Sequence, residues 1–123
     1  MGRYISGDLE GKCWFGVQPS DFADRFGRMG DSSHIEYYFQ NDDLPVIEKE
    51  LKSIEKQNGE YIKKLDEFFE THKSYAYEEI EKLLSMTQDS ARFVLREYAD
   101  YKFGIRLRDY LKTHEECVFE VEC

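Results

Sequence analysis

The sequence predicts an α+β fold, in which a small antiparallel sheet packs against a layer of long amphipathic helices. Three observations predict it: alternating apolar and polar residues near both ends of the chain, helical periodicity through the middle, and a length of 123 residues, which suffices for a sizeable core. We expect a single domain over residues 1–123, in which the C-terminal strand joins the N-terminal strands.

The N-terminal third contains the first strands. Residues 3–18 are typical of a strand, a turn and a second strand, because glycines punctuate two runs of β-forming residues. Residues 20–26 favour a short helix that Ser20 caps and Gly27 ends. Residues 34–40 alternate strictly, which predicts a half-exposed strand. The buried side of that strand is expected to comprise Ile35, Tyr37 and Phe39.

The long helix predicted over residues 42–72 is the central element. Its apolar positions recur in alternating steps of four and three once Asn58 is counted, which is the a/d seam of a helix that packs along its length against another helix. Asp42 and Asp43 can cap its start, and Pro45 fits the first turn. The seam consists of Ile47, Leu51, Ile54, Asn58, Tyr61, Leu65 and Phe68.

The Asn58-Gly59 pair leaves two alternatives open. A polar residue in a seam usually fixes register or partner number, so Asn58 favours a seam shared between two chains. Asn-Gly is also a strong turn signal, which favours a break that splits the helix in two, and Gly59 alone can mark a kink or a close crossing. The length of the seam and the many aromatic residues lead us to expect a homodimer.

Two more helices and a strand complete the chain. Residues 74–86 and 88–113 have helical periodicity, and the second stretch is interrupted at Gly104, where a first segment can end. Residues 117–123 alternate, which predicts a strand with a mostly acidic outer face. The inward helical positions are Tyr77, Ile80, Leu83, Leu84, Ala91, Val94, Leu95, Tyr98, Tyr101, Ile105 and Leu111.

The net charge of −9 restricts the partners. Residues 31–91 hold fifteen acidic and seven basic residues, so the acidity is assigned to the central helices. A chain this acidic is repelled by free nucleic acid and by anionic membranes, and no apolar run is long enough to span a membrane. We therefore expect no direct nucleic-acid or membrane binding. Another protein with a basic surface is the expected partner, although the same acidity can serve solubility alone.

Motif content argues against catalysis. The three cysteines form no CxxC pair, which indicates a reducing, cytoplasmic environment. The sequence has no P-loop, no Rossmann fingerprint and no nucleophile motif. His114 and Cys117 have ligand-like spacing, but zinc would need two further ligands from distant positions. The expectation is a protein that is not an enzyme and that has no cofactor and no metal site.

Arginines supply the candidate ligand-binding site. Arg92 and Arg96 lie one turn apart on one helix face, and a guanidinium group can grip phosphate or carboxylate in a fork. Tyr98 and Tyr101 are close by and could stack on a base. We predict that these four residues bind a ligand. The alternative is that the arginines pair internally with the surplus acidic residues.

The first third of the chain carries a resemblance. Its opening, Gly2-Arg3-Tyr4, Gly7-Asp8, Gly11-Lys12 and Trp14-Phe15-Gly16-Val17-Gln18, resembles the start of small accessory proteins found in phage and metagenomic sequence. The later Tyr37-Tyr38-Phe39 and Asp43-Leu44-Pro45 fit the same resemblance. What it implies is a context, because small acidic phage proteins often bind and inhibit host proteins, anti-CRISPR proteins among them. No functional residue is carried over from it.

Two function hypotheses follow. The first is a non-enzymatic acidic binding protein, a phage-type inhibitor that acts in the host cytoplasm on a basic, nucleic-acid-handling host protein. Its acidic helix faces would imitate the charge of nucleic acid. The alternative is a small-ligand binder, or a sponge for a phosphorylated signalling nucleotide, held by Arg92 and Arg96.

Overall fold

Strands from both ends of the chain form one antiparallel sheet in the computed structural model, which describes residues 4–12, 22–27, 35–72 and 76–122. The order is β2-β1-β4-β3, so the C-terminal strand lies between two N-terminal ones and the predicted closure of the sheet is confirmed. Residues 13–18 of the predicted second strand and the expected cap Ser20 lie outside the described residues. The strands are β1 (Tyr4–Gly7), β2 (Gly11–Lys12), β3 (Ile35–Gln40) and β4 (Glu116–Glu122).

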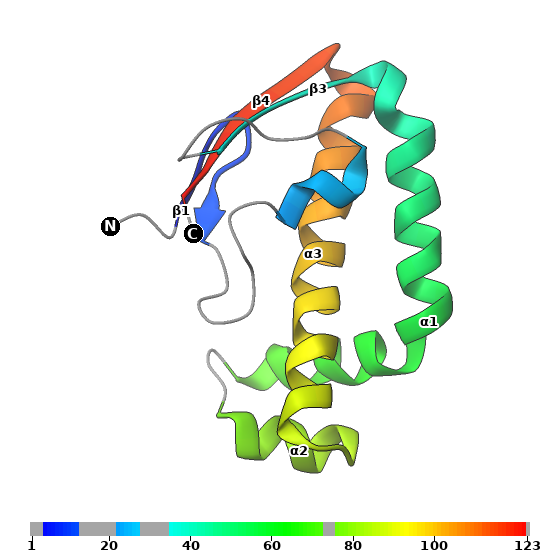
Figure 1. The fold of residues 1–123 in the computed structure, drawn as a ribbon, viewed down its shortest axis with the longest axis vertical. Coiled ribbons are helices and arrows are strands. Elements are labelled where there is room, and N and C mark those ends of the chain that lie inside the picture. Colours follow the sequence, from blue (N-terminus) through cyan, green and yellow to red (C-terminus); the bar gives the residue numbers. More distant parts are fainter. Residues whose placement is uncertain (1–3, 13–21, 28–34, 73–75, 123) are drawn as a thin grey trace.

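The helices form a layer on one face of this sheet, which confirms the α+β fold class (Figure 1). The sheet covers one end of α3, and α1 bends about halfway along, so that its second half runs across the other end of α3 together with α2 (Figure 1). The helical elements are η1 (Phe22–Phe26), η2 (Asn41–Asp43), α1 (Leu44–Thr71), α2 (Tyr77–Leu84) and α3 (Gln88–Thr113).

Aromatic rings fill the space between the sheet and α3. Successive side chains of a strand point to opposite faces, so the alternation of β3 places Tyr37 and Phe39 inward, as predicted. Both rings stack on Phe119 of β4, with centroids 5.3 and 5.8 Å apart. Phe103 of α3 meets the same ring edge-on at 5.2 Å. These contacts fix the sheet on the helical layer.

The apolar stripe of α1 is buried within a single chain. The predicted core positions Leu51, Ile54 and Leu65 are buried, but Phe68 and the seam residue Tyr61 are only half-buried, so this part of the prediction is wrong. Ile62 is buried instead, because an α-helix turns once in 3.6 residues and the stripe drifts away from a strict 3.5-residue repeat. The stripe packs against α2 and α3 of its own chain, and so it no longer argues for a homodimer.

The Asn58-Gly59 pair does not end the helix. α1 is continuous through it, and the helix bends in its middle part, where the ribbon is green (Figure 1). Asn58 is 6% exposed, and its Nδ2 donates to the carbonyl oxygen of Ile54 at 3.4 Å. Asn58 is therefore satisfied within its own helix.

The start of α1 differs from the prediction. Asp43 stands at the N-cap but makes no side-chain cap; its carboxylate accepts a hydrogen bond from the backbone N–H of Gln40 at 2.8 Å. The acid thus stabilises the turn that leads out of β3. Pro45 lies in the first turn of α1 as predicted, where its missing N–H leaves no bond unmade.

Gly104 permits a close crossing and does not interrupt α3. The helix has the predicted bounds and runs unbroken through this residue. A Cβ placed on Gly104 would lie 2.6 Å from the ring of Phe26 and 2.8 Å from the side chain of Leu51. The glycine is thus required by the approach of η1 and α1 to α3.

The apolar interior is divided into two clusters. One lies between the sheet and the adjoining halves of α1 and α3, and the other joins the distal halves of these helices to α2. The division falls between Leu51 and Ile54 on α1, and between Tyr98 and Phe103 on α3. The first cluster is centred on Phe26, Phe39, Leu51, Leu107 and Phe119, and the second on Ile54, Leu65, Ile80, Leu84 and Leu95.

Candidate functional site

The four residues predicted to bind a ligand lie on α3, and they do not face one another. Arg92 and Arg96 are exposed on one side of the helix. Tyr98 is buried and donates from its hydroxyl to Asp66 of α1 at 2.7 Å. Tyr101 donates its hydroxyl to Glu55, also on α1. The tyrosines thus link α1 to α3, while the arginines stand on the exposed side.

The two tyrosine hydroxyls are held in the protonated form. Burial, and then the hydrogen bond to Asp66, raise the pKa of Tyr98 above its usual value. Burial and the hydrogen bond to Glu55 raise the pKa of Tyr101 to about 12. Lys102 pairs with Asp66 at 3.0 Å and lies 5.7 Å from the centroid of the Tyr98 ring. This arrangement joins two helices, and the burial of Tyr98 removes its ring from the exposed position that stacking on a base would require.

Arg25 of η1 is the centre of a partly buried ion network. Its guanidinium donates to Glu97, to Asp100 at 2.8 Å and to Glu50 at 3.1 Å. Burial disfavours the charged form of Arg25, but the hydrogen bonds and charges of Glu97 and Asp100 outweigh it and raise the pKa above its usual value. Asp100 is fully buried, and the Nε of Arg96 lies 3.8 Å from its carboxylate. The network ties η1, α1 and α3 together where the two apolar clusters meet.

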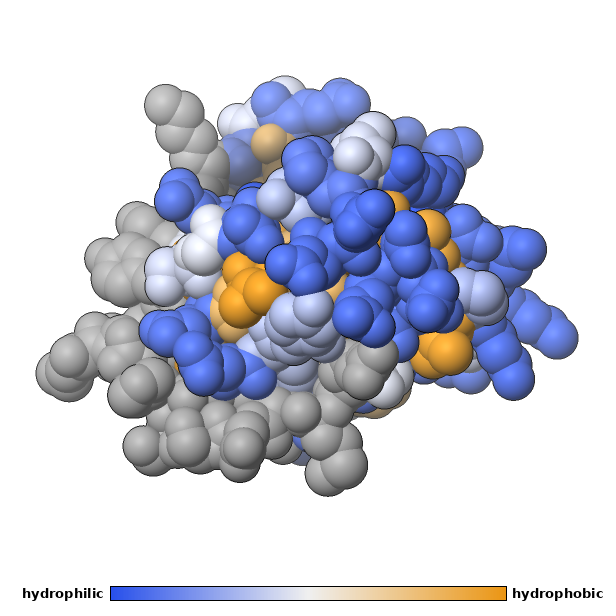
Figure 2. Space-filling model, turned by 90° about the horizontal axis from the view of Figure 1, so that it is seen from above, coloured by the Kyte–Doolittle hydropathy of each residue, from blue (hydrophilic) through white to orange (hydrophobic). Residues whose placement is uncertain are grey.

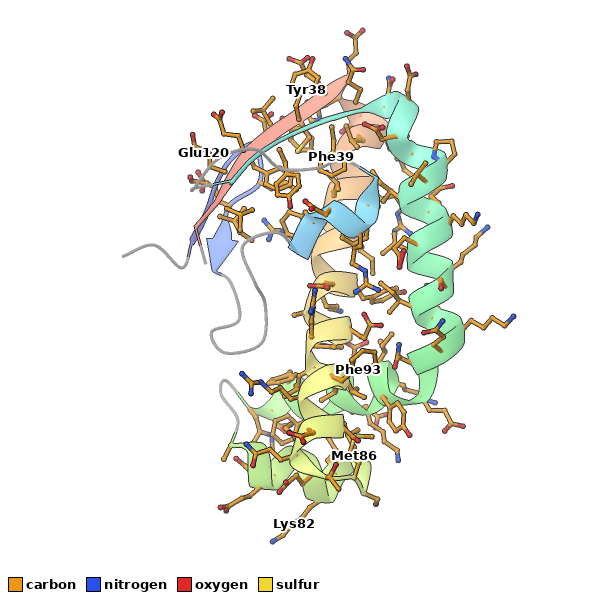
Figure 3. All side chains as sticks on the ribbon, viewed as in Figure 1. Tyr38, Phe39, Lys82, Met86, Phe93 and Glu120 are labelled. Atoms are coloured by element: carbon orange, nitrogen blue, oxygen red, sulfur yellow. The ribbon has the colours of Figure 1, made fainter. Side chains whose placement is uncertain are left out.

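A hollow of about 360 Å³ opens beside this network. Phe93 projects from α3 on the side of α1 and is 58% exposed (Figure 3). The positions 93, 96, 97 and 100 share one face of α3, since they are spaced by three and four residues. The residues that line the hollow are Arg25, Glu50, Phe93, Arg96 and Glu97.

Sequence reasoning missed Arg25 as the centre of this network, although a signal existed. Glu97 and Asp100 fall within the apolar face of residues 88–113, where unpaired acids are costly to bury. Two acids at such positions require a cation. The sequence could not say that the cation comes from residue 25, which lies more than seventy positions away along the chain.

The outer face of the sheet carries a second cluster of charges. Glu36 lies directly opposite Glu120 in the β3–β4 pairing, and Tyr38 lies opposite Val118. Tyr38 is 45% exposed and its hydroxyl donates to Glu116. Tyr38 and Glu120 point away from the helices, whereas Phe39 points toward them (Figure 3). We name as the acidic sheet face the side chains of Glu36, Tyr38, Glu116, Val118 and Glu120.

The strands β3 and β4, with the residues that adjoin them, are rich in acidic residues. Residues 35–43 and 114–122 contain seven Asp or Glu residues and no Lys or Arg. The two segments are adjacent, because β3 pairs with β4 and the N–H of Asn41 donates to the carbonyl of Glu115 at 2.9 Å. In contrast, α1 alternates acids with lysines. From above, this end of the molecule is largely hydrophilic with small apolar patches (Figure 2).

The described residues contain no group of three or more His, Cys, Asp or Glu side chains arranged to hold a metal ion. Cys117 of the predicted ligand spacing is buried in β4, and burial, followed by the charge of Asp8, raises the pKa of its thiol to about 12. Within the same parts of the chain, no helix has the length and apolar character needed to span a bilayer.

Comparisons with protein-family models, curated proteins and solved structures find no match to this chain.

Proposed function

We propose that the protein is a non-enzymatic binding protein whose acidic sheet face docks on a basic surface of a partner protein. The partner is a nucleic-acid-handling protein of the host, and the chain acts in the host cytoplasm as a phage-type inhibitor of the anti-CRISPR kind. The phage context rests on the resemblance of the N-terminal residues. The choice of surface rests on the sheet.

The acidic sheet face is the observation that carries the proposal. Glu36 and Glu120 are exposed and directly opposite one another, and like charges in that position destabilise a sheet. No Lys or Arg in either strand offsets them. The repulsion lowers the stability of the free protein. A basic partner would relieve it on binding, and this relief would add to the affinity.

Tyr38 gives the face an anchor. Interfaces draw most of their energy from a few residues, in which Tyr, Trp and Arg are enriched and which are surrounded by a polar rim. The Tyr38–Val118 pair lies between the Glu36–Glu120 pair and the Gln40–Glu116 pair, which is such an arrangement. A basic side chain of the partner could stack on the Tyr38 ring and reach a carboxylate on either side.

A defined set of variants tests the proposal. Wild-type protein is immobilised and exposed to nuclease-treated host lysate, and the retained proteins are eluted with rising salt. The sheet variant combines Glu36→Lys with Glu120→Lys. The control combines Glu67→Lys with Glu70→Lys, which makes the same charge change at exposed positions of α1. We expect the control to retain a basic, nucleic-acid-binding protein at the wild-type salt concentration, and the sheet variant to lose it.

The captured partner then provides the decisive measurement. Wild-type protein should displace the partner's nucleic acid in a competition assay, and the sheet variant should not. Equal capture by the sheet variant and the control would refute the role of the face. A captured partner that binds no nucleic acid would refute the inhibitor role and leave only acidic protein binding.

The second hypothesis, a binder of a phosphorylated nucleotide, has less support. Tyr98 and Tyr101 are engaged with acids of α1, and the hollow beside Arg96 contains the carboxylates of Glu50 and Glu97. A phosphate would meet these carboxylates at close range. Thermal-shift measurements against nucleotides still separate the hypotheses, because a bound ligand raises the melting temperature by mass action. The homodimer likewise stays a prediction, for which light scattering is the direct measurement.

A further inference from the structure

The strand β3 ends the sheet on one side, so one of its two edges has no partner among the described strands. The direction of its backbone groups follows from the ladder with β4. This ladder continues to Asn41, whose N–H donates to the carbonyl oxygen of Glu115 directly opposite it. In an antiparallel ladder, pairs that exchange hydrogen bonds alternate with pairs that do not. The odd-numbered residues of β3 therefore bond to β4, and the even-numbered residues direct their N–H and C=O groups to the open edge.

The other side of β4 agrees with this assignment. Val118, which lies opposite Tyr38, bonds to β1 through its backbone. Its carbonyl accepts from the N–H of Asp8, and its own N–H donates to the carboxylate of Asp8, each at 2.8 Å. Val118 thus directs its backbone groups away from β3, as the alternation requires. The open edge accordingly carries the backbone groups of Glu36, Tyr38 and Gln40.

This edge lacks the usual protection against pairing with another strand. Natural edge strands are commonly short, bulged, or interrupted by Lys or Pro. β3 is six residues long, pairs with β4 without a bulge, and contains neither Lys nor Pro. The N–H of Gln40 is bonded to Asp43, which closes that end of the edge and leaves the groups of Glu36 and Tyr38. An extended segment added here would gain main-chain hydrogen bonds, which supply the affinity in strand addition.

Charge determines which segment fits the edge. Glu36 is the only charged residue of β3, and its side chain is exposed on the acidic sheet face together with Tyr38. In an added antiparallel strand, the residues opposite these two project their side chains onto the same face. A Lys or Arg opposite Glu36 would form an opposite-charge pair, and one opposite Tyr38 could lie against its ring. A second copy of this chain would instead add an acidic strand and a further net charge of −9, which disfavours self-pairing.

We infer that β3 binds an extended segment of the partner protein as an additional antiparallel strand, with Lys or Arg at alternate positions of that segment. The inference rests on the proposed function, because it takes the same acidic sheet face and the same basic partner, and it adds how the partner is held. Hydrogen bonds to the backbone of Glu36 and Tyr38 provide affinity, and the side chains of the face select positive charge. The antiparallel direction matches the pairings of the described strands.

Amide hydrogen exchange of the full chain, measured by NMR, tests the inference residue by residue. The probe is a capped seven-residue peptide in which lysine alternates with threonine. In the free protein, the amides of Glu36 and Tyr38 should exchange faster than those of Tyr37 and Phe39, which bond to β4. At saturation with the peptide, exchange at Glu36 and Tyr38 should slow at least about tenfold, and exchange at the other two should change little. Equally slow exchange at all four in the free protein would mean that the edge is covered, and would overturn the inference.

Methylated peptides separate main-chain pairing from charge. The residues of the added strand that lie opposite Glu36 and Tyr38 direct their own N–H groups to β3, and in the expected register these residues are lysines. Methylation of two lysine amides removes those donors, whereas methylation of two threonine amides keeps them at the same total charge. We expect the first peptide to bind at least about tenfold more weakly than the unmodified one, and the second to bind almost as tightly. An equal loss in both peptides would contradict the antiparallel pairing.

Two variants measure the contribution of charge. Glu36→Gln keeps the backbone of the edge and removes its charge, so it should weaken peptide binding several-fold. Glu67→Gln removes an exposed carboxylate of α1 and should change nothing. Wild-type affinity in Glu36→Gln would contradict the selection of a basic segment.

The outcomes distinguish this inference from the proposed function. Peptide binding that shifts the resonances of Glu120 but leaves exchange at Glu36 and Tyr38 unchanged would overturn strand addition, while the acidic sheet face would remain a docking surface. Slower exchange at Glu36 and Tyr38 as the concentration of the protein alone rises would assign the edge to a second copy and overturn the inference. Protection by the peptide, without capture of any basic protein from host lysate, would support strand addition and count against the proposed host partner.

Discussion

Glu36 of β3 and Glu120 of β4 lie directly opposite one another, with both carboxylates exposed on the face of the sheet that the helices leave open. Cross-strand neighbours on one face have Cβ atoms roughly 5 Å apart, so the two charges repel at short range. Neither strand contains a Lys or Arg that would separate them. This relationship makes the stability of the sheet sensitive to charge at either position.

Glu120→Lys should raise the free energy of unfolding by roughly 0.2–1 kcal/mol, because it converts the like-charge pair into an opposite-charge pair. Urea denaturation gives the value directly. The double variant Glu36→Lys/Glu120→Lys restores like charges and should return to wild-type stability. An additive result in this double-mutant cycle would mean that the two side chains do not interact. The gain should shrink at high salt, since exposed charges are screened.

Asn58→Leu should keep or raise the melting temperature and leave the molar mass unchanged. Asn58 is buried within one chain and makes a long hydrogen bond to its own helix, so a leucine loses little there and adds apolar contact. Leu65→Ala is the reference, because that fully buried side chain should cost about 2–5 kcal/mol. Light scattering measures the mass. A change of oligomeric state in Asn58→Leu would instead support the alternative that Asn58 lies in a seam shared between two chains.

The two helical glycines should respond to alanine in opposite directions. A Cβ on Gly59 meets no atom within 4 Å, so Gly59→Ala should stabilise the protein by about 1 kcal/mol through helix propensity. A Cβ on Gly104 would collide with Phe26 and Leu51, so Gly104→Ala should destabilise it by about 1–3 kcal/mol. Thermal melting of the two variants side by side provides the comparison. A stabilised Gly104→Ala would mean that α3 crosses α1 at a larger distance.

The protein should lose stability as the solution becomes alkaline. The pKa of Tyr101 is about 12 in the folded chain and about 10 when unfolded, so the folded state holds the proton more tightly. This contribution is complete below about pH 10 and is lost as the pH rises toward 12. Cys117, whose pKa is also raised to about 12, adds a loss that begins near pH 9. Urea midpoints at pH 8, 10 and 11 measure the trend.

Tyr101→Phe is the test of that assignment. It removes the ionisable hydroxyl, so the loss above about pH 10 should become shallower while the part due to Cys117 persists. Parallel pH profiles for the wild type and Tyr101→Phe would show that the hydrogen bond to Glu55 does not hold the proton. Absorbance of tyrosinate near 295 nm reports the ionisation itself.

Periodicity predicted most of the elements because it is a local property. The alternation in residues 34–40 defines β3, and the helical stretch over residues 88–113 coincides with α3. Errors occurred where a distant segment decides burial. Ile62 is buried in place of Tyr61 because the stripe that meets α2 and α3 follows the 3.6-residue turn of the helix, which a strict count of alternating threes and fours does not reproduce.

The surfaces were harder to predict than the fold. The acidity was assigned to the central helices, because residues 31–91 carry most of the excess acid. Pairing of β3 with β4 brings acids from the start of that block and from the C-terminal strand onto one face, while the lysines of α1 offset the acids of the helix. Similarly, Arg25 meets Glu97 and Asp100 only in the folded chain. The acidic sheet face depends on strand register, and the Arg25 network depends on contacts between residues far apart in the sequence. Local residue spacing reveals neither of them.

The position of β4 between β1 and β3 also determines when the sheet can be completed during synthesis of the chain. A ribosome synthesises α1, α2 and α3 and the strands β1, β2 and β3 before it synthesises β4. Until residue 122 has emerged, β3 lacks the strand that carries Glu116, Val118 and Glu120, so the acidic sheet face does not exist. The surface on which the proposed binding depends is therefore completed only after every helix of the core has been synthesised.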